Sequence, residues 1–470
     1  MLFNSYIFIF AFLPITFTLY FLLLKKRLVG SAKTFLVFAS LFFYSWWNIA
    51  YLPLILGSIL FNYVLGGILN DSLSSIKSRT KLFLAFGISV NIGLLAYFKY
   101  SDFFIENVNF FSGSSIQLLD LALPLAISFF TFQQIAYLVD SYRGQTSEYD
   151  FLNYALFVTF FPQLIAGPIV HHAEMMPQFA SKWNLIKRYR NISLGLFIFS
   201  VGLFKKVVIA DTFAVWANTG FDDSEVLSFV DAWATSLSYT FQLYFDFSGY
   251  TDMAIGSALL FNIKLPINFN SPYKSLTIQD FWRRWHITLS NFLRDYIYIP
   301  LGGNRKGDFR VYVNLLATFV IGGAWHGAGW TFILWGGLHG LALITHRIWS
   351  QAGLGMPRLL AWFITFNFVN IAWVFFRARD WNDAMKVLSG MFFATPNFNS
   401  FEINVLGDDT ALYFLSFLAA AFAITLFTKN SIQYKPYFSP SSVYMVASVS
   451  MALIALYFLH RPTEFLYFNF

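Results

Sequence analysis

The sequence predicts an all-α polytopic membrane protein with about 11–12 transmembrane helices and additional re-entrant or interfacial helices. Apolar residues make up 57% of the 470 positions and charged residues only 12%, whereas soluble domains carry roughly 25% charged residues. The mean hydropathy is +0.58. Apolar residues gather in runs of about 20, the length that crosses the hydrocarbon of a bilayer. Because no linker or repeat divides the chain, we expect one membrane domain over residues 1–470.

About twelve apolar runs have this length, and short loops separate them. They are Ser5–Leu24, Ser31–Trp47, Ala50–Leu69, Lys81–Tyr100, Leu118–Asp140, Ile192–Asp211, Leu227–Phe247, Arg310–Ala324, Ala328–Arg347, Leu359–Phe376, Thr410–Thr428 and Ser441–His460. No basic residue precedes the first run and three follow it, the opposite order to a signal peptide. Basic and acidic or neutral loops alternate. The positive-inside rule therefore predicts both termini in the periplasm, with Arg377 and Arg379 as exceptions.

Two regions do not read as simple spans. Phe151–Pro168 is apolar, yet Pro162, Gly167 and Pro168 interrupt it. Both of its flanks are predicted to be cytoplasmic, so this segment is expected to enter and leave on the same side. Irregular backbone at membrane depth is tolerated only inside protein or along a wet cavity. The second region, Gly249–Phe309, is polar, rich in turns and arginine, and contains many aromatic residues.

Several function classes are excluded or unsupported. The chain has no cysteine, which excludes disulfides, thiolate metal sites and a cysteine nucleophile. Its net charge of +7 comes from loops between apolar runs, so membrane orientation explains it better than nucleic-acid binding. No phosphate-binding loop, serine-nucleophile elbow, zinc-protease motif or EF-hand spacing occurs. We therefore expect no metal site.

His326 is the first candidate catalytic residue. It lies in GGAWHGAGW, residues 322–330, between two apolar runs. The glycines allow another helix or a ligand to approach closely, and Trp325 supplies a flat apolar wall. An ionisable side chain inside a membrane usually has a function, and imidazole suits a general base near neutral pH. The alternative is a hydrogen-bonded turn between two packed helices.

The stretch Phe281–Arg305 is the second candidate region. Written as one helix, it places Arg283, His286, Ser290 and Arg294 on one face and Trp282, Trp285, Leu289, Phe292 and Tyr296 on another. Such a helix suits the membrane interface. Its arginines, which include Arg284, either anchor the chain to anionic lipid or cradle an anionic ligand such as phosphates.

A third stretch, Tyr244–Gly256, contains Asp246 and Asp252 near the inner end of a predicted span. These carboxylates could orient a histidine or bind an acceptor hydroxyl. Equally, they could cap the helix and pair with the arginine-rich loop.

Taken together, these stretches resemble the membrane-bound O-acyltransferase (MBOAT) family, and within it the membrane subunits of bacterial alginate O-acetylation. The resemblance rests on four motifs in order, spread over residues 120–350. They are FFPQLIAGPI (160–169), YFDFSGYTDMAIG (244–256), FWRRWHITLSNFLRDYIYIPLGGNR (281–305) and GGAWHGAGWTFILWGGLHG (322–340). The first hundred residues match in character more than in motif, and the last hundred match weakly.

The resemblance implies a ring of membrane helices in the bacterial inner membrane, pierced by a tunnel. It implies catalytic roles for His326 and His286, and donor binding by Arg283, Arg284 and Arg294. Asp246, Asp252, Asn291 and Trp325 are then expected along the tunnel or near the acceptor. The donor would be acetyl-CoA as a co-substrate, with no tightly bound cofactor. The expected acceptor is an extracellular or periplasmic polysaccharide such as alginate. Expected partners are membrane lipids and a periplasmic SGNH-type protein.

Other functions stay open at this point. D-alanyl or another acyl transfer to a cell-wall polymer uses related chemistry. A transporter or flippase for a glycan or lipid belongs to a different class, and broken helices occur in such proteins. The absence of an inverted repeat between the two halves weakens the transporter hypothesis.

Overall fold

The computed structural model describes residues 1–71, 77–146, 150–165, 167–393, 411–461 and 466, and every regular element among them is helical. The predicted all-α class is confirmed. These residues form two compact units, each assembled from three chain segments. The first unit comprises Met1–Leu203, Tyr250–Pro266 and Phe438–Leu453. The second comprises Phe204–Gly249, Ile267–Tyr437 and Ile454–Phe470.

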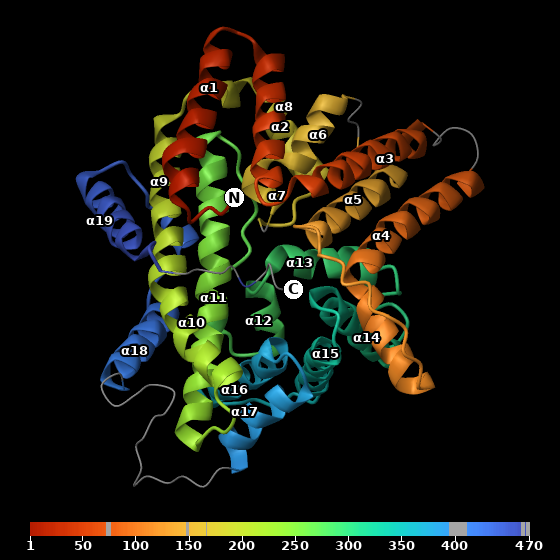
Figure 1. Ribbon diagram of the computed structural model, residues 1–470, viewed down its shortest axis with the longest axis vertical. Coiled ribbons are helices and arrows are strands. Elements are labelled where there is room, and N and C mark those ends of the chain that lie inside the picture. The colour runs from red at the N-terminus through yellow and green to blue at the C-terminus, as the bar shows by residue number, and fades with distance from the viewer. Residues whose placement is uncertain (72–76, 147–149, 166, 394–410, 462–465, 467–470) are drawn as a thin grey trace. The chain divides into compact units, whose positions relative to one another are not determined.

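The first unit contains the N-terminal helices. α1 (Leu13–Lys25) packs on α2 (Val29–Ser45), and both α3 (Leu52–Asp71) and α4 (Lys77–Ser112) pack on α5 (Ile127–Tyr142) (Figure 1). A reciprocal amide pair joins α3 and α4. Asn91 donates to Asn62 at 2.7 Å, and Asn62 donates back at 3.1 Å. Both amides are buried, and such pairing satisfies polar groups that lipid cannot.

The predicted irregular segment is broken as expected. Asp150 caps the N-terminus of α6 (Phe151–Thr159). Its side chain accepts a hydrogen bond from the backbone N–H of Leu152 at 3.0 Å. Phe160 then leaves the helical conformation, and a single turn, α7 (Phe161–Leu164), follows with Pro162 in its first turn. α8 (His172–Ala180) and α9 (Tyr189–Phe204) complete this part of the unit.

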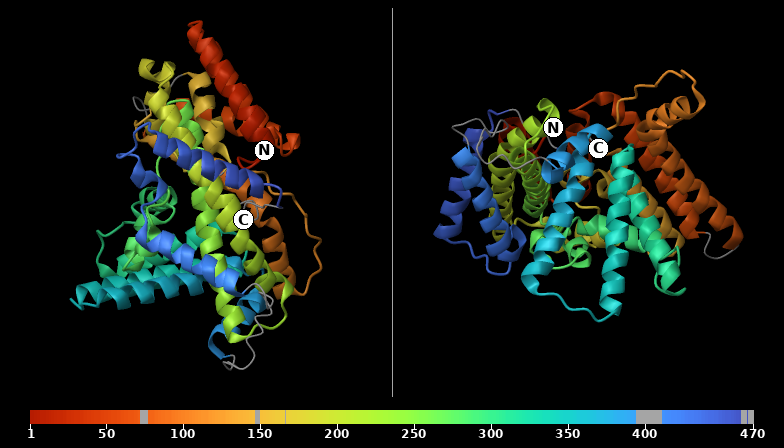
Figure 2. Two further views of the ribbon diagram at one scale, coloured as in Figure 1. Left: turned by 90° about the vertical axis from the view of Figure 1, so that its left-hand side faces the viewer. Right: turned by 90° about the horizontal axis from the view of Figure 1, so that it is seen from below.

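The second unit contains the motif-bearing helices. α11 (Phe229–Leu260) contributes to both units, and α15 and α16 run antiparallel to each other (Figure 2). The other elements of this unit are η5 (Lys205–Ala210), α10 (Asp211–Asn218), η6 (Thr219–Asp223), η7 (Pro272–Lys274), α12 (Ile278–Arg284), α13 (Ile287–Leu293), η8 (Arg294–Tyr298), α14 (Asp308–His326), α15 (Trp330–Gln351), α16 (Arg358–Arg377), α17 (Trp381–Phe393), α18 (Ala411–Phe427) and η9 (Ser431–Tyr434).

The helices fit a multi-pass membrane protein. Among the described residues, 5 helical stretches are long and apolar enough to cross a bilayer: Phe8–Lys25, Ile49–Asn70, Thr80–Ser112, Tyr189–Asp223 and Arg358–Arg377. Shorter apolar helices are α2, α18 and α19 (Ser442–Phe458). The remaining predicted spans fall on α5, α11, α14 and α15, which are helical but outside that set. Arg377 and Arg379, the exceptions to the charge pattern, both pair with Asp222.

Two predicted boundaries were wrong. The run Leu118–Asp140 becomes helical only at Ile127, because Pro124 lacks an N–H and Ala126 is left-handed with φ 60°. The run Leu227–Phe247 was expected to end before the polar residues that follow it. Instead α11 continues to Leu260, and the apolar side chains in this extension, Met253 among them, are buried.

A buried charge cluster explains why α11 tolerates Asp246. Lys206 in η5 pairs with Asp246 at 2.7 Å and also with Asp211, and all three side chains are almost fully buried. The backbone N–H of Leu466 donates to the second oxygen of Asp246 at 3.1 Å. A charge inside a membrane protein is retained only when it is paired in this way.

α14 and α15 approach each other unusually closely, and glycines make this possible (Figure 1). A Cβ on Gly323 would lie 2.3 Å from the carbonyl oxygen of Phe332. A Cβ on Gly336 would lie 2.2 Å from the carbonyl oxygen of Phe319. Both obstacles are backbone atoms, which cannot rotate away as a flexible side chain can. The contact therefore requires a residue without a side chain at each position.

This contact gives a matched pair of substitutions. We expect Gly336→Ala to destabilise the protein by about 2–3 kcal/mol, because the added methyl group forces α14 and α15 apart. Gly337→Ala is the control, since nothing lies within 4 Å of its Cβ position. The control should gain about 0.5–1 kcal/mol from better helix propensity. Thermal unfolding of the detergent-purified variants measures both effects. Equal melting temperatures would contradict the close-contact assignment.

Candidate active site

His326 is the last residue of α14, and α15 begins four residues later at Trp330. The intervening residues turn the chain so that α15 packs back on α14. The glycine contact between the two helices lies within one turn of the histidine, at Gly323. The local sequence therefore determines the position of this imidazole. It does so through the end of α14, the short turn that follows and the close contact between α14 and α15.

Aromatic rings surround the His326 imidazole. Ring centroids of Trp325, Phe376 and Trp335 lie 4.9, 5.0 and 5.1 Å from it, and the Trp335 ring is almost perpendicular at 89°. We call these three rings the aromatic enclosure. His326 is only 4% exposed. Any donor or acceptor must therefore reach this ring through the protein interior.

His286 lies beside His326, with 6.3 Å between the ring centroids. The two histidines come from separate motifs, and the fold of the second unit brings them together. His286 is fully buried and its ring packs edge-on against Phe247, 4.8 Å away. Burial lowers the pKa of His286, in the loop between α12 and α13, to about 3. Its imidazole is therefore neutral near pH 7.

The expected single helix over Phe281–Arg305 was wrong. α12 ends at Arg284, His286 has φ 43° and ψ 54°, and α13 starts at Ile287. Arg283, His286 and Arg294 therefore do not share one helix face. Two backbone bonds hold the break open. Asn270 N–H donates to Arg284 C=O at 2.9 Å, and Ile287 N–H donates to Asn268 C=O at 3.0 Å.

The left-handed backbone of His286 is itself informative. A residue other than glycine in this region costs of order 1–3 kcal/mol, and such strain concentrates at functional sites. In this conformation the ring of His286 packs against Phe247 and lies beside His326. The geometry thus favours a site role for His286 over simple membrane anchoring.

His339 packs against Trp335, one of the three rings of the aromatic enclosure. Trp282 Nε1 donates to His339 Nδ1 at 3.1 Å, and His339 is fully buried. Because indole N–H only donates, His339 Nδ1 must accept, which places the ring proton on Nε2. The His339 ring lies 4.8 Å from Trp335, which in turn packs on His326.

The remaining predicted site residues are distributed differently. Asp246 belongs to the charge cluster with Lys206, and not to a pair with the arginine-rich loop. Sequence reasoning missed Lys206, although a lysine inside an apolar run was a signal for a buried partner. Asp252 is buried in the first unit, whereas His326 lies in the second. Asn291 is half-buried on α13.

The three arginines also differ from one another. Arg284 Nε contacts both oxygens of Asp280 at 3.0 Å, and Arg294 pairs with Asp295 at 2.7 Å. Their charges are thus partly neutralised by neighbours in the sequence. Arg283 is exposed, and no carboxylate lies within 4.0 Å of it among the described residues.

Comparison with known proteins agrees with this geometry. Residues 139–379 match the model of the MBOAT, membrane-bound O-acyltransferase family. The chain is 58% identical over 423 residues to a peptidoglycan O-acetyltransferase of Helicobacter pylori, covering 83% of this chain and 80% of that protein. It is 39% identical over 431 residues to a probable alginate O-acetylase of Pseudomonas aeruginosa, covering 90% of this chain and 81% of that protein.

These identities correct the expected subfamily, because similarity to the peptidoglycan enzyme is higher than similarity to the alginate protein. The activity itself is common to both relatives. The four motifs, the paired histidines and the matched region coincide, since His286 and His326 both lie inside residues 139–379. This chain is an O-acetyltransferase of the membrane-bound O-acyltransferase family.

Proposed function

We propose that this protein moves acetyl groups from a cytoplasmic thioester, acetyl-CoA, to the hydroxyl groups of peptidoglycan outside the inner membrane. The observation that carries the proposal is the pairing of His326 and His286 inside the second unit, 6.3 Å apart and shielded by aromatic rings. The 58% identity to a peptidoglycan O-acetyltransferase supports the acceptor. Alginate is the second candidate, supported by 39% identity.

In the proposed reaction, the acceptor hydroxyl oxygen attacks the carbonyl carbon of the thioester, and His326 takes the hydroxyl proton. This general-base step is typically worth about 10²–10⁴-fold in rate. The tetrahedral oxyanion then collapses, the carbon–sulfur bond breaks, and the proton passes from His326 to the departing sulfur. The products are an acetyl ester and a free thiol.

The developing oxyanion needs a hydrogen-bond donor. His286 is the donor that the geometry favours, because its ring faces His326 and is held by a strained backbone. Asn291, on the next helix, is the second candidate. Exclusion of water by Trp335 and Phe376 strengthens such a bond, since a low-dielectric site increases electrostatic interactions.

The acetyl group has two possible routes once it leaves the donor. It passes directly to the glycan, or first to a hydroxyl of a periplasmic SGNH-type partner. Both routes use the same attack at His326. D-alanyl transfer would use the same base but a carrier protein as the donor. A transporter would not consume the thioester at all.

A cavity of about 370 Å³ in the second unit suits the phosphate end of the donor. Its polar lining comes from α12, η8, the loop before α14 and the end of α15: Gln279, Tyr298, Asn304, His346, Arg347 and Gln351. Arg283 interacts electrostatically with His346. Arg283 thus acts on a residue that lines the cavity, and the lining itself adds Arg347, which sequence reasoning did not select.

Arg347 is only partly neutralised. Its Nη2 contacts Asp308 Oδ1 at 3.1 Å, while its Nε is buried and has no hydrogen-bond partner among the described residues. Hydrogen bonds from Arg347 and then from Gln351 hold the pKa of Asp308 below its ordinary value. Arginine binds phosphate through two parallel N–H groups, so a free Nε beside this cavity favours a phosphate ligand.

His326→Ala should abolish most of the acetyl transfer, by about 10²–10⁴-fold, because the general base is lost. Mass spectrometry of muropeptides from cells expressing each variant measures O-acetylation, and immunoblotting measures protein level. His460→Ala is the control, since His460 is exposed at the end of α19. Unchanged acetylation at normal protein level would contradict the assignment. Turnover of radiolabelled acetyl-CoA by purified protein, lost in His326→Ala, separates transfer from transport.

His286→Gly tests the role of the imidazole ring separately from the role of the left-handed backbone at this position. Glycine adopts φ 43° without strain, so the break between α12 and α13 should persist, while the cavity left by the buried ring lowers the melting temperature. Transfer should fall by about 10²–10³-fold if the ring stabilises the oxyanion. A glycine variant with full activity would assign His286 to structure alone. Muropeptide acetylation measures the loss of transfer, and thermal unfolding measures the change in stability.

Arg347→Gln and Asp308→Asn together show whether Arg347 binds a ligand or only joins α15 to α14 through its ion pair with Asp308. If Arg347 binds donor phosphate, its loss should weaken coenzyme A binding about tenfold, whereas Asp308→Asn frees the guanidinium and should not weaken it. If the ion pair only joins α14 to α15, both variants should behave alike. Calorimetric titration with coenzyme A, and with pantetheine as the ligand without phosphate, measures this. Arg358→Gln, an exposed arginine outside the cavity, is the control.

A further inference from the structure

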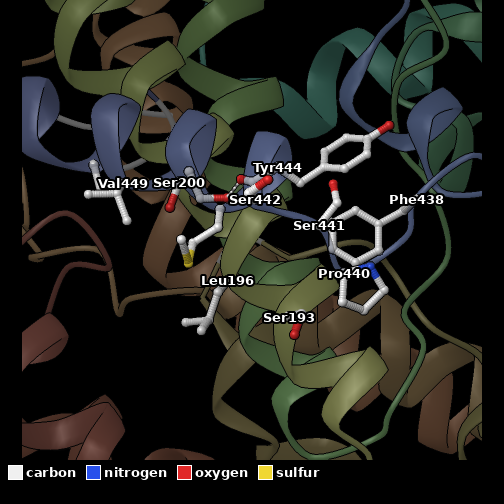
Figure 3. A pocket seen from close by; sticks show the side chains of 12 residues that line it. Ser193, Leu196, Ser200, Phe438, Pro440, Ser441, Ser442, Tyr444 and Val449 are labelled. Carbon is white, nitrogen blue, oxygen red and sulfur yellow. Dashed lines mark hydrogen bonds between the residues drawn. The ribbon is translucent and has the colours of Figure 1, made fainter.

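A cavity in the first unit lies between α9 and α19, outside the histidine motifs (Figure 3). It has a volume of about 630 Å³ (Figure 3). α9 contributes Ser193 and Leu196, and α19 with its leading residues contributes Ser442, Met445, Val449 and Ala452. None of these residues belongs to the four motifs or to the candidate active site. We call this cavity the α9–α19 groove.

The groove is held open at one end by aromatic contacts. Phe197 on α9 packs against Phe438 at 5.7 Å and Tyr444 at 5.2 Å. The lining positions on α19 are separated by three or four residues, so they form one helix face that looks toward α9. Leu196, Met445 and Val449 remain 50%, 62% and 52% exposed. The two helix faces therefore approach at one end without closing on each other.

Hydrocarbon suits this groove better than water. Leu196, Met445 and Val449 present exposed apolar surface along the groove, and contact with hydrocarbon removes that surface from water. Five serines also line the groove, and the hydroxyl of one of them, Ser448, donates to the carbonyl of Tyr444 at 2.7 Å. Both helices are apolar, and α9 starts a stretch long enough to cross the bilayer. Lipid acyl chains are therefore available at this surface.

One end of the groove is polar and positively charged. Ser193 lies in the first turns of α9 and Ser442 begins α19. Arg190 stands three residues before Ser193, on the same face of α9, and is exposed. Lys187 lies over the ring of Phe17 and Arg188 over that of Trp183, so Arg190 supplies the positive charge at this end. Such an arrangement attracts an anionic headgroup, while the other end offers only apolar side chains.

We propose that the α9–α19 groove binds one anionic phospholipid. Its acyl chain lies along Leu196, Met445, Val449 and Ala452, and its phosphate contacts Arg190 and the serine hydroxyls. Charge complementarity at the headgroup end selects this occupant over a second protein helix.

The test is native mass spectrometry of the purified full-length protein in mixed micelles that contain equal amounts of phosphatidylglycerol and phosphatidylcholine. Wild type should retain one lipid, predominantly phosphatidylglycerol. Ala452→Trp fills the groove and should reduce retained lipid about tenfold. Val449→Phe, a smaller obstruction, replaces it if the tryptophan variant does not fold. Ala420→Trp is the matched control, because Ala420 is exposed on the apolar helix α18.

Arg190→Gln tests the headgroup separately. It should leave total lipid retention unchanged and lower the preference for phosphatidylglycerol about fivefold. Equal retention by Ala452→Trp and Ala420→Trp would mean non-specific annular lipid only, and would overturn the proposal. Equal retention of the two lipids by wild type would also overturn it, as would a partner helix cross-linked at position 445 in place of lipid.

Discussion

The structure of the candidate active site depends on the close contact between α14 and α15. Gly323 and Gly336 bring the two backbones within van der Waals distance, and His326 ends α14 one turn after Gly323. Trp335, one position before Gly336, packs on the histidine ring as a consequence of that contact. The same small residues that let the helices associate therefore also set the geometry of the general base.

Polar groups in the helical core are paired according to one principle. Asn62 with Asn91, Lys206 with two aspartates, and Trp282 with His339 are each satisfied by a partner on another element. A bilayer offers no water to replace such a partner, so each pair also specifies which helices meet. Pairing of this kind explains why a chain with few charged residues can still have a unique arrangement within each unit.

Much of this arrangement was predictable, because it is encoded locally. Runs of apolar residues gave the helices, and the glycine–histidine–tryptophan pattern around position 326 identified the principal histidine. The break at His286 was not predictable in this way. The helical periodicity of Trp282, Trp285 and Leu289 continues across it, and the bonds that enforce it come from Asn268 and Asn270, more than a dozen residues away. Likewise, Asp246 was recognisable as important, but its partner Lys206 lies 40 residues earlier and only the fold brings them together.

The left-handed backbone at position 286 limits which residues evolution can place there. His326 ends a regular helix, so its backbone conformation is open to almost any residue. At His286 only glycine, asparagine and aspartate share a tolerance for that conformation. Divergent members of such a family that lose transfer activity should therefore drift freely at the first position and toward a narrow set of residues at the second. The backbone conformation at position 286 should therefore still restrict the residue types found there after the transfer activity has been lost.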